Sequence, residues 1–406
     1  MRVIRGMIDL EVPLPFNIYK GDGSLLMRQG VVIYNQSRID QLCQWETYTT
    51  ANGEKDDAPA ASIVTKADDV TVTDYIEDLM FRLDITYSNF LTNGFNVVND
   101  VTRISVELYH KMISDPDAMI GMVHLRTDLK HSIIRTLQNA VFSILTANSL
   151  GWSKQRVTKL ASAALTENLG MLSMQEDLFR HSGPLQEWQT EAIRKHPATS
   201  VQMLIGMGVK DKDWLRAVGY HHERMDGSGY PNKQQGSAIF EESRVLAIAD
   251  RYGATISPRM DRKPGSPQDV MRYLLKGEKE QYDQDIVRHF IAEIGVYPPG
   301  ITVRLKNGDI AVVTHRRAKR TFPLVSSIWD RELVPYDFPV ERDTYFSEFA
   351  ILGHFLHDDA SRLNEDALWG KERHRLGKDI QMFRVHDEYH TTSAEDAELS
   401  GEVTLF

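Results

Sequence analysis

The sequence SIIRTLQNAVFSILTANSL, residues 132–150, indicates the fold of this protein. Its apolar residues recur three and four positions apart, which is the period of an amphipathic helix packed on other helices. The same period runs through VTRISVELYHKMI (residues 101–113) and KQRVTKLASAALTENLGML (residues 154–172). We therefore predict a mainly α protein with an all-helical domain over residues 121–297.

Both flanks of the helical domain carry β signals. The stretch FNIYKGDGSLLMRQGVVIY (residues 16–34) predicts two or three strands with a tight turn at Gly21-Asp22-Gly23. Further on, ITVRLKNGDIAVVTH (residues 301–315) alternates apolar residues around Asn307-Gly308, which is a hairpin signature. The expected order is a small N-terminal β-rich domain with its linker (1–65), a helical connector (66–120), the helical domain (121–297), a short C-terminal β hairpin segment (298–340) and a mixed C-terminal tail (341–406).

Composition narrows the class of protein. The 406 residues contain 47 Lys and Arg against 57 Asp and Glu, and the net charge of −10 has the wrong sign for a protein that coats nucleic acid. The one cysteine, Cys43, excludes an internal disulfide and a multi-thiolate zinc site. No apolar run reaches the roughly 20 residues that span a bilayer, so we expect a cytoplasmic protein without a membrane segment. The basic run HRRAKR, residues 315–320, is interpreted as a solvated loop.

Three separate stretches of the helical domain carry residues that bind metals. They are His196 in RKHPATS, the pair His221-His222 in HHERMDGSGYP, and Asp250 in AIAD. Imidazoles and a carboxylate are ligands of Fe, Mn, Zn and Ni, and helices can hold them facing one another inside a bundle. Any one of these histidines alone would more often pack or cap a helix. Together with Asp226 and the glycine-rich turn, they favour a metal site.

These motifs resemble the HD-GYP family, a branch of the HD superfamily of metal-dependent phosphohydrolases. The stretches HHERMDGSGYP (residues 221–231) and ESRVLAIADRYGATIS (residues 242–257) carry the resemblance. It extends to IRKHP (193–197), GVYPPG (295–300) and VRLKNGDIAVV (303–313). The N-terminal VPLPFNIY and GSLLMRQGVVI resemble the small β domain that precedes some members. The resemblance implies an HD-type all-helical bundle.

In this family the bundle holds two or three metals, usually iron or manganese, and a bridging hydroxide attacks a phosphodiester of cyclic di-GMP. Such metals lower the pKa of bound water and neutralise charge on the phosphoryl oxygens. By resemblance, four metal-ligand positions of the family fall on His196, His221, His222 and Asp250.

The resemblance also implies residues that contact the nucleotide. It places the GSGYP loop, with Gly229 and Tyr230, beside the cyclic di-GMP site and in contact with diguanylate cyclase (GGDEF) domains. Arg259 and Arg262 in SPRMDRK fall where they could reach phosphates, because arginine makes bidentate phosphate contacts. The alternative for both arginines is a solvated face. Arg135 would add an anion contact in a metal-free pocket.

The chain departs from the family pattern at several positions. Where the family has His-Asp followed by Gly-Lys, this chain reads LTENLGML, so that Glu167 and Asn168 take the metal-binding places and Met171 takes that of the lysine. Upstream, Arg135 stands where a ligand histidine is expected, one turn after His131. An asparagine has one neutral oxygen and cannot bridge two cations, and a guanidinium never deprotonates and repels a cation. We therefore expect a degenerate HD motif.

Two hypotheses follow from these departures. The first is a cyclic di-GMP signalling protein of HD-GYP type that is non-catalytic or impaired and acts as a receptor or interaction module, with Fe or Mn at partial occupancy or absent. The alternative is an active metal-dependent phosphodiesterase that uses a reduced site, with Glu167 beside the four ligand positions and His131 as a further candidate ligand. No catalytic residue is assigned. A homodimer through residues 71–120 stays open, because their apolar stripe would look the same if it packed within one chain.

Overall fold

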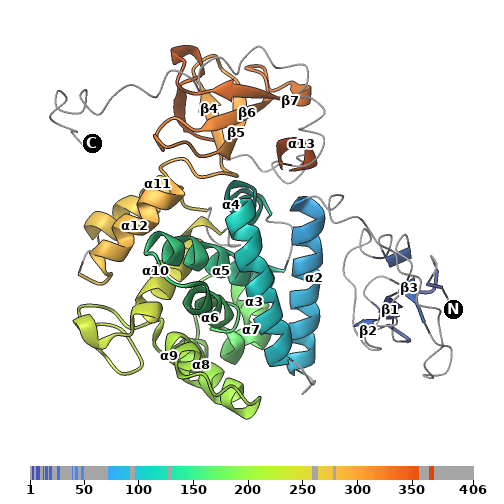
Figure 1. Ribbon diagram of the computed structural model, residues 1–406, viewed down its shortest axis with the longest axis vertical. Coiled ribbons are helices and arrows are strands. Elements are labelled where there is room, and N and C mark those ends of the chain that lie inside the picture. Colours follow the sequence, from blue (N-terminus) through green and yellow to red (C-terminus); the bar gives the residue numbers. More distant parts are fainter. Residues whose placement is uncertain are drawn as a thin grey trace.

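The computed structural model describes most of the helical part and of the C-terminal strands. The described ranges are residues 72–91, 97–126, 130–257, 264–277, 280–355 and 365–369, together with short stretches between residues 2 and 49. The helices form one body, and the C-terminal strands lie against one end of it (Figure 1). None of the described helices combines the length and the apolar character that a membrane crossing requires.

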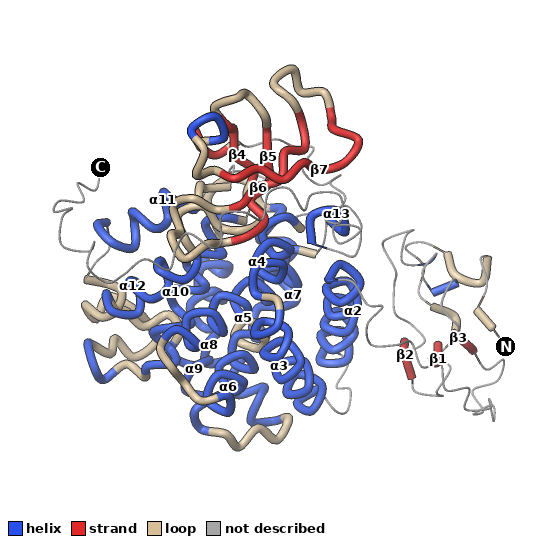
Figure 2. Tube along the Cα trace, turned by 45° about the horizontal axis from the view of Figure 1, so that its top comes forward, coloured by secondary structure: helices blue, strands red, loops and turns tan. Residues whose placement is uncertain are grey.

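Helices make up most of the described chain, and Figure 2 shows them as one bundle with the red strands of the C-terminal sheet at one end. The α-helices are α2 Val72–Leu91, α3 Val97–Ser114, α4 Pro116–Leu125, α5 His131–Ser149, α6 Lys154–Ala164, α7 Leu172–Arg180, α8 Glu187–Gly206, α9 Lys212–Tyr220, α10 Glu241–Ile256, α11 Pro267–Arg272, α12 Gln284–Ile294 and α13 Glu365–Trp369. Shorter helical segments are η2 Leu169–Met171, η3 Gly236–Ala238, η4 Tyr273–Gly277 and η5 Ser347–Phe349. The strands are β1 Ile18–Lys20, β2 Leu25–Met27, β3 Thr47–Tyr48, β4 Thr302–Leu305, β5 Ile310–His315, β6 Leu324–Trp329, β7 Pro335–Asp343 and β8 Ile351–His354.

Helix α5 is the centre of the bundle. Its apolar residues, including Leu137, Val141 and Ile144, are fully buried, and α4, α6, α10 and α12 pack around it. This burial confirms the helix that the three-and-four period predicts. The same helix buries Arg135 and Asn139, so their hydrogen bonds must be made inside the protein.

Side-chain caps fix the first turns of α6, α9 and α12. Ser153, Asp211 and Asp283 accept hydrogen bonds from backbone N–H groups at the starts of α6, α9 and α12. These N–H groups have no partner within their helix, and each cap contributes about 1 kcal/mol. The Asp211 cap therefore sets where α9 begins, and the histidine pair follows directly after the last residue of this helix.

The apolar stripe of residues 71–120 is buried within this chain. Leu79 and Leu83 of α2, and Val101 and Leu108 of α3, belong to the same hydrophobic core as α5. The stripe considered for a homodimer contact therefore packs against the chain's own helices. The helices of the expected connector share one core with those of the helical domain.

The C-terminal strands form one antiparallel sheet in the order β7-β6-β5-β4-β8. Strands β4 and β5 pair on either side of Asn307-Gly308, as the sequence predicts, and Gly308 adopts a φ of 98° that favours glycine. The sheet extends beyond residue 340, because β8 pairs with β4. Strand β8 therefore comes from the expected C-terminal tail, and local sequence does not predict pairing across this separation.

The basic run of residues 315–320 is a solvated loop only in part, because Ala318 and Lys319 are exposed whereas the side chain of Arg316 is buried. The side chain of Arg316 is buried and forms an ion pair with Asp117 at the start of α4. Its Nη1 also donates to the backbone carbonyl of Glu293 at 2.6 Å. Because these partners come from distant segments, the charge pattern around residue 316 does not reveal them. Arg316 joins the sheet to α4 and α12.

Helix α13 adds a second contact between the sheet and the bundle. Trp369 lies over Gly121 of α4, where a Cβ atom would come within 2.3 Å of the indole ring. The Trp369 Nε1–H donates to the backbone carbonyl of Thr314 on β5 at 3.0 Å. Glycine is needed at position 121 because any side chain would meet this ring.

The N-terminal strands form a separate three-stranded sheet in the order β2-β1-β3. Strands β1 and β2 are antiparallel, which confirms the predicted pair of strands, although the turn at residues 21–23 lies outside the described residues. A small apolar cluster that includes Val3, Leu14 and Leu42 packs on Phe81 of α2. The N-terminal sheet thus has its own small core, which ends on the helical bundle.

Candidate functional site

A pocket of about 190 Å³ is formed by α5, α7, α8 and α10 and the turn before α7. Its polar lining includes Arg135, Asn168, His196, His222 and Asp250. The other lining residues are His131, Met171, Gln175, Leu178, Phe179, Leu185, Ile193 and Ala254. Residues that the sequence places far apart therefore meet at one cavity.

His196 lies in α8 directly before Pro197. Proline has no backbone N–H, so the carbonyl of Ile193, four residues earlier, loses its usual helical partner. His196 Nδ1 lies 2.6 Å from this carbonyl oxygen and donates to it. This bond fixes the neutral ring with its proton on Nδ1 and leaves a lone pair on Nε2.

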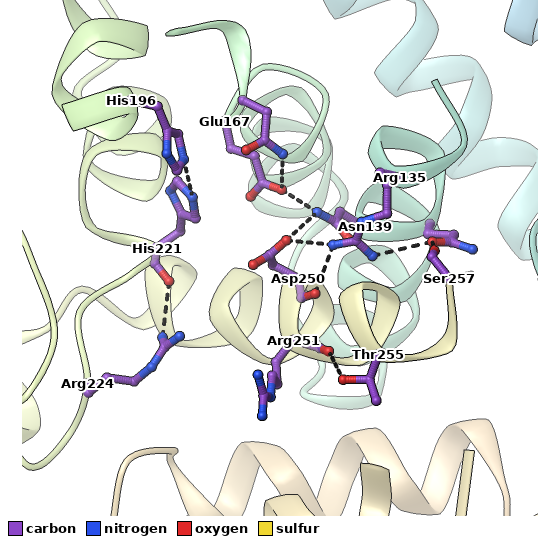
Figure 3. A network of polar contacts seen from close by, with 12 residues as sticks. Arg135, Asn139, Glu167, His196, His221, Arg224, Asp250, Arg251, Thr255 and Ser257 are labelled. Carbon is purple, nitrogen blue, oxygen red and sulfur yellow. Dashed lines mark hydrogen bonds and ion pairs between the residues drawn. The ribbon is translucent and has the colours of Figure 1, made fainter. Parts of the chain in front are cut away.

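His221 follows the last residue of α9, where the terminal carbonyls have no helical partners. Its Nδ1 donates to the backbone carbonyl of Val218 at 2.6 Å. His221 Nε2 lies 3.2 Å from His196 Nε2 (Figure 3). Because both neutral rings carry their proton on Nδ1, neither Nε2 can donate and two lone pairs face each other. A shared cation would relieve this repulsion.

His222 completes a three-histidine cluster with His196 and His221, whose ligand nitrogens lie within 4.8 Å of one another. Tyr230 stacks on His222 with ring centroids 4.7 Å apart. Gly229 packs so closely on this turn that a Cβ atom would lie 2.5 Å from the His222 carbonyl oxygen. Gly229 and Tyr230 thus brace His222 and are not among the residues that line the pocket.

The three imidazoles are held in the neutral form. Burial, together with His221, lowers the pKa of His196 to about 3. Burial also lowers the pKa of His221, and it lowers the pKa of His222 well below its ordinary value. Neutral imidazole is the form that binds metals, so the cluster has the donor set of a site for one divalent transition metal.

Arg135 forms a buried ion pair with Asp250. Its Nη2 donates to Asp250 Oδ1 at 2.7 Å and to the Asp250 backbone carbonyl at 2.9 Å (Figure 3). Its Nη1 lies 3.4 Å from Gln138 Oε1. Burial opposes ionisation of Asp250, but Arg135, then His221 and the Asn139 amide, lower its pKa below the ordinary value. A permanent cation therefore already neutralises Asp250.

Glu167 and Asn168, at the place of the HD pair, are buried. The Asn139 Nδ2 donates to Glu167 Oε1 and, at 3.2 Å, to Asp250 Oδ1, while Asn168 Nδ2 lies 3.3 Å from Glu167 Oε1. Burial, then the charge of Asp250, raises the pKa of Glu167 well above its ordinary value, which favours the protonated carboxyl. Within the described ranges, Glu167 Oε2 has no hydrogen-bond partner. This carboxyl group is thus joined to the Arg135 ion pair.

His131 begins α5 and stacks on Phe179 of α7, with ring centroids 4.4 Å apart. It lines the pocket but is not part of the three-histidine cluster. Arg259 and Arg262, the two arginines expected to reach phosphates, lie outside the described residues. Apart from His131, the predicted metal-ligand positions that are described fall into two groups, the histidine cluster and the network around Arg135.

Sequence reasoning did not single out Asn139 and Gln175. Asn139 lies one helical turn after Arg135, so the spacing of four residues could have placed both on the same side of α5. Gln175 lies four residues after Met171, near the start of α7. The apolar residues of the pocket gave no sequence signal, because the same residues would suit a helical core.

Comparison with known proteins finds an HD domain in this sequence. Residues 117–286 match the HD domain family. The chain is 24% identical over 213 residues to the cyclic di-GMP phosphodiesterase PA4108 of Pseudomonas aeruginosa. The matched region covers 52% of this chain and 51% of that protein. It is 24% identical over 183 residues to the cyclic di-GMP phosphodiesterase PdeB of Borreliella burgdorferi, which covers 45% and 48%.

A further relative, the 3′3′-cGAMP-specific phosphodiesterase 1 of Vibrio cholerae, is 35% identical over 131 residues, or 32% of this chain and 30% of that protein. The chain thus spans about half the length, or less, of these curated relatives. Among solved structures, Bd1817, an HDG"Y"P protein from Bdellovibrio bacteriovorus, covers 71% of this chain and 97% of its own, with a TM-score of 0.49 and 14% identity.

Proposed function

Because residues 117–286 form an HD domain of the HD-GYP family, we propose that the protein is a cyclic di-GMP signalling protein that binds the dinucleotide and hydrolyses it weakly or not at all. Relatives named as phosphodiesterases of cyclic di-GMP or cGAMP support a cyclic dinucleotide as the ligand of the pocket. The proposed role is that of a receptor or interaction module.

The ion pair between Arg135 and Asp250 carries this proposal. Hydrolysis by a bridging hydroxide needs two cations side by side, and a shared carboxylate to hold them. The Asp250 carboxylate already has a guanidinium 2.7 Å away, and this group cannot lose its proton. A divalent ion about 4 Å from a guanidinium is repelled by roughly 8 kcal/mol at an effective dielectric constant of about 20. Asn168 offers no second anionic bridge.

The remaining donors suit one cation. His196, His221 and His222 would hold it, and when bound it would supply Lewis-acid stabilisation of a phosphate oxygen. The chain's own contribution is to orient the rings, through the backbone carbonyls that accept from His196 and His221 and through the stacking of Tyr230 on His222.

The second candidate is an active phosphodiesterase with a reduced site. The observation that favours it is the same three-histidine cluster, because its neutral rings and facing lone pairs are suited to a functional cation. The two candidates differ in whether this single site supports turnover.

Reconstitution separates them. The full chain, loaded anaerobically with Fe(II) or Mn(II), is analysed for metal content, for cyclic di-GMP binding by calorimetry and for hydrolysis by chromatography. We expect at most one metal per chain, measurable binding and intact dinucleotide. Two metals per chain, with turnover that His222→Ala abolishes and the exposed control His110→Ala retains, would refute the proposal.

Contacts with GGDEF domains, a homodimer and a cytoplasmic location are further proposals. The tip of the GSGYP loop is exposed, and Asp226 Oδ1 accepts from both the backbone N–H and the hydroxyl of Ser228, so the tip has a defined shape. Light scattering coupled to size-exclusion chromatography, with and without a GGDEF domain, tests the two assembly proposals.

A further inference from the structure

The ring of His222 is held differently from the other two imidazoles of the cluster. His196 and His221 each donate from Nδ1 to a backbone carbonyl at 2.6 Å. Within the described ranges, no hydrogen bond holds the ring of His222, which instead stacks on Tyr230 with an angle of 29° between the ring planes. The orientation of this third donor therefore depends on where the loop places Tyr230.

A buried carboxylate fixes the chain directly after Tyr230. Glu223 is 3% exposed, and its Oε1 accepts from the backbone N–H of Asn232 at 2.6 Å. Its Oε2 accepts from the backbone N–H of Gln234 at 2.9 Å. The residue between these two donors, Lys233, has a φ of 55°, a conformation that favours glycine. Backbone N–H groups around a left-handed residue can form a nest for an anion, and here the Glu223 carboxylate fills the nest.

The two ends of the loop meet beside the histidine cluster. Glu223 directly follows His222 in the chain, and the Tyr230 N–H donates to the His222 carbonyl oxygen at 3.2 Å. Gly229 packs on this contact, since a Cβ atom there would come within 2.6 Å of the Glu223 Cα. Strained backbone such as that at Lys233 persists where surrounding contacts require it, and it is frequent at functional sites. The nest therefore anchors the segment that carries Tyr230 to the residue next to His222.

We propose that Glu223 is a positioning residue for the cation of the three-histidine cluster, and that it acts through Tyr230 on the ring of His222. This inference rests on the single cation site of the proposed function. Groups that orient metal ligands typically contribute about 10–100-fold in metal affinity. Without the carboxylate, the backbone after Tyr230 loses its anchor and the ring of His222 loses its support, although the chain keeps all three imidazoles.

Calorimetric titration of the full chain with Mn(II) tests this role. Glu223→Met removes both acceptor oxygens at a similar side-chain length, and we expect it to bind Mn(II) about 10–100-fold more weakly than the wild type. Glu223→Gln keeps one acceptor and should fall between the two. Tyr230→Leu removes the stacking ring and should show a loss similar to that of Glu223→Met. Because Glu223 acts through Tyr230, the double variant should bind no more weakly than either single variant.

A second nest of the same kind supplies the matched control. Asp330 Oδ1 accepts from the backbone N–H groups of Glu332 and Val334 at 2.8 and 2.9 Å. The residue between these donors, Leu333, has a φ of 63°. This nest lies in the turn between β6 and β7, and none of its residues lines the pocket. Asp330→Leu should therefore lower the thermal transition but leave the affinity for Mn(II) unchanged.

The outcomes separate this inference from the proposed function. Wild-type affinity for Mn(II) in Glu223→Met, an equal loss in Asp330→Leu, or losses that add in the double variant would overturn the inference alone. No binding of Mn(II) to the wild type would overturn the single cation site and the inference with it, whereas binding of cyclic di-GMP decides the receptor role separately.

Hydrogen exchange of the wild type provides a measurement that needs no variant, and it decides if Glu223→Met does not fold. If the nest supports cation binding, the cation must stabilise the nest by the same factor, because coupling between two sites is reciprocal. Mn(II) should therefore slow exchange at the amides of Asn232 and Gln234. Unchanged rates at both amides in Mn(II)-saturated protein would contradict the coupling.

Discussion

Replacing Arg135 by methionine tests whether this side chain takes the place of a cation. Methionine keeps an unbranched side chain but removes the guanidinium, so the carboxylate of Asp250 loses its charged partner. Breaking a buried ion pair from one side costs about 3–5 kcal/mol. The side chains of Arg135 and Asp250 are 6% and 19% exposed, and the partial solvation of Asp250 favours the lower end, about 3 kcal/mol.

For domains of about 150–250 residues, each kcal/mol shifts Tm by roughly 2–4 °C. In buffer with a chelator, Arg135→Met should therefore lower Tm by about 6–12 °C. The space beside Asp250 would then be open to a divalent ion. An ion at 100 times its Kd stabilises the folded state by about 2.7 kcal/mol, so Mn(II) should restore most of this loss. Elemental analysis should find about one more manganese per chain than in the wild type.

A control variant separates metal binding from general destabilisation. Arg244→Met breaks the ion pair between Arg244 and Asp283, whose side chains are 20% and 14% exposed. Arg244 lies on α10, the helix that carries Asp250, but it does not line the pocket. It should lower Tm by a similar amount without the additional gain from Mn(II). The reasoning is refuted if Arg135→Met binds no more manganese than the wild type, or if Arg244→Met shows the same gain.

Three further changes test other contacts, each by urea unfolding. Gly121→Ala should cost about 1–3 kcal/mol, because the new Cβ atom would lie within 2.3 Å of the Trp369 ring; an unchanged stability would contradict the contact. Arg316→Ala should destabilise by up to about 3 kcal/mol and should do so less in an Asp117→Ala background, whereas additive effects would show that the two do not interact. Burial lowers the pKa of His124 to about 4, so the contribution of the neutral ring to stability is present above about pH 6.5 and is lost as pH falls toward 4. His124→Gln should therefore reduce the pH dependence of the free energy of unfolding between about pH 4 and pH 6.5. The same slope in both proteins would contradict this role of His124.

Local sequence predicted much of the fold. The apolar period of residues 132–150 corresponds to α5, because residues three and four positions apart lie on the same face of a helix. The Asn307-Gly308 pair corresponds to the turn between β4 and β5, because the turn needs a positive φ. Contacts such as that of Arg316 with Asp117, 199 residues away, depend on how the elements assemble and leave no local pattern.

The candidate site also combines features that local sequence predicted with contacts that depend on how the helices assemble. The His-Pro and His-His motifs predicted histidines that converge, and the structure brings their nitrogens together. His196 and His221 are each oriented by a bond from Nδ1 to a backbone carbonyl that has no partner within its helix. Arg135 was expected to enter the site, and it does. Arg135 pairs with Asp250, 115 residues away, because α5 packs against α10. Whether Asp250 also binds a metal stays a prediction.

The buried guanidinium differs from a metal ion in one further respect. Arg135 is bonded to the backbone of α5, so the positive charge beside Asp250 is present in every copy of the chain at a fixed ratio. It cannot be chelated, replaced by another element or changed in oxidation state, as an iron ion can. The electrostatic character of this half of the pocket should therefore stay the same in cells short of iron and in cells exposed to oxygen.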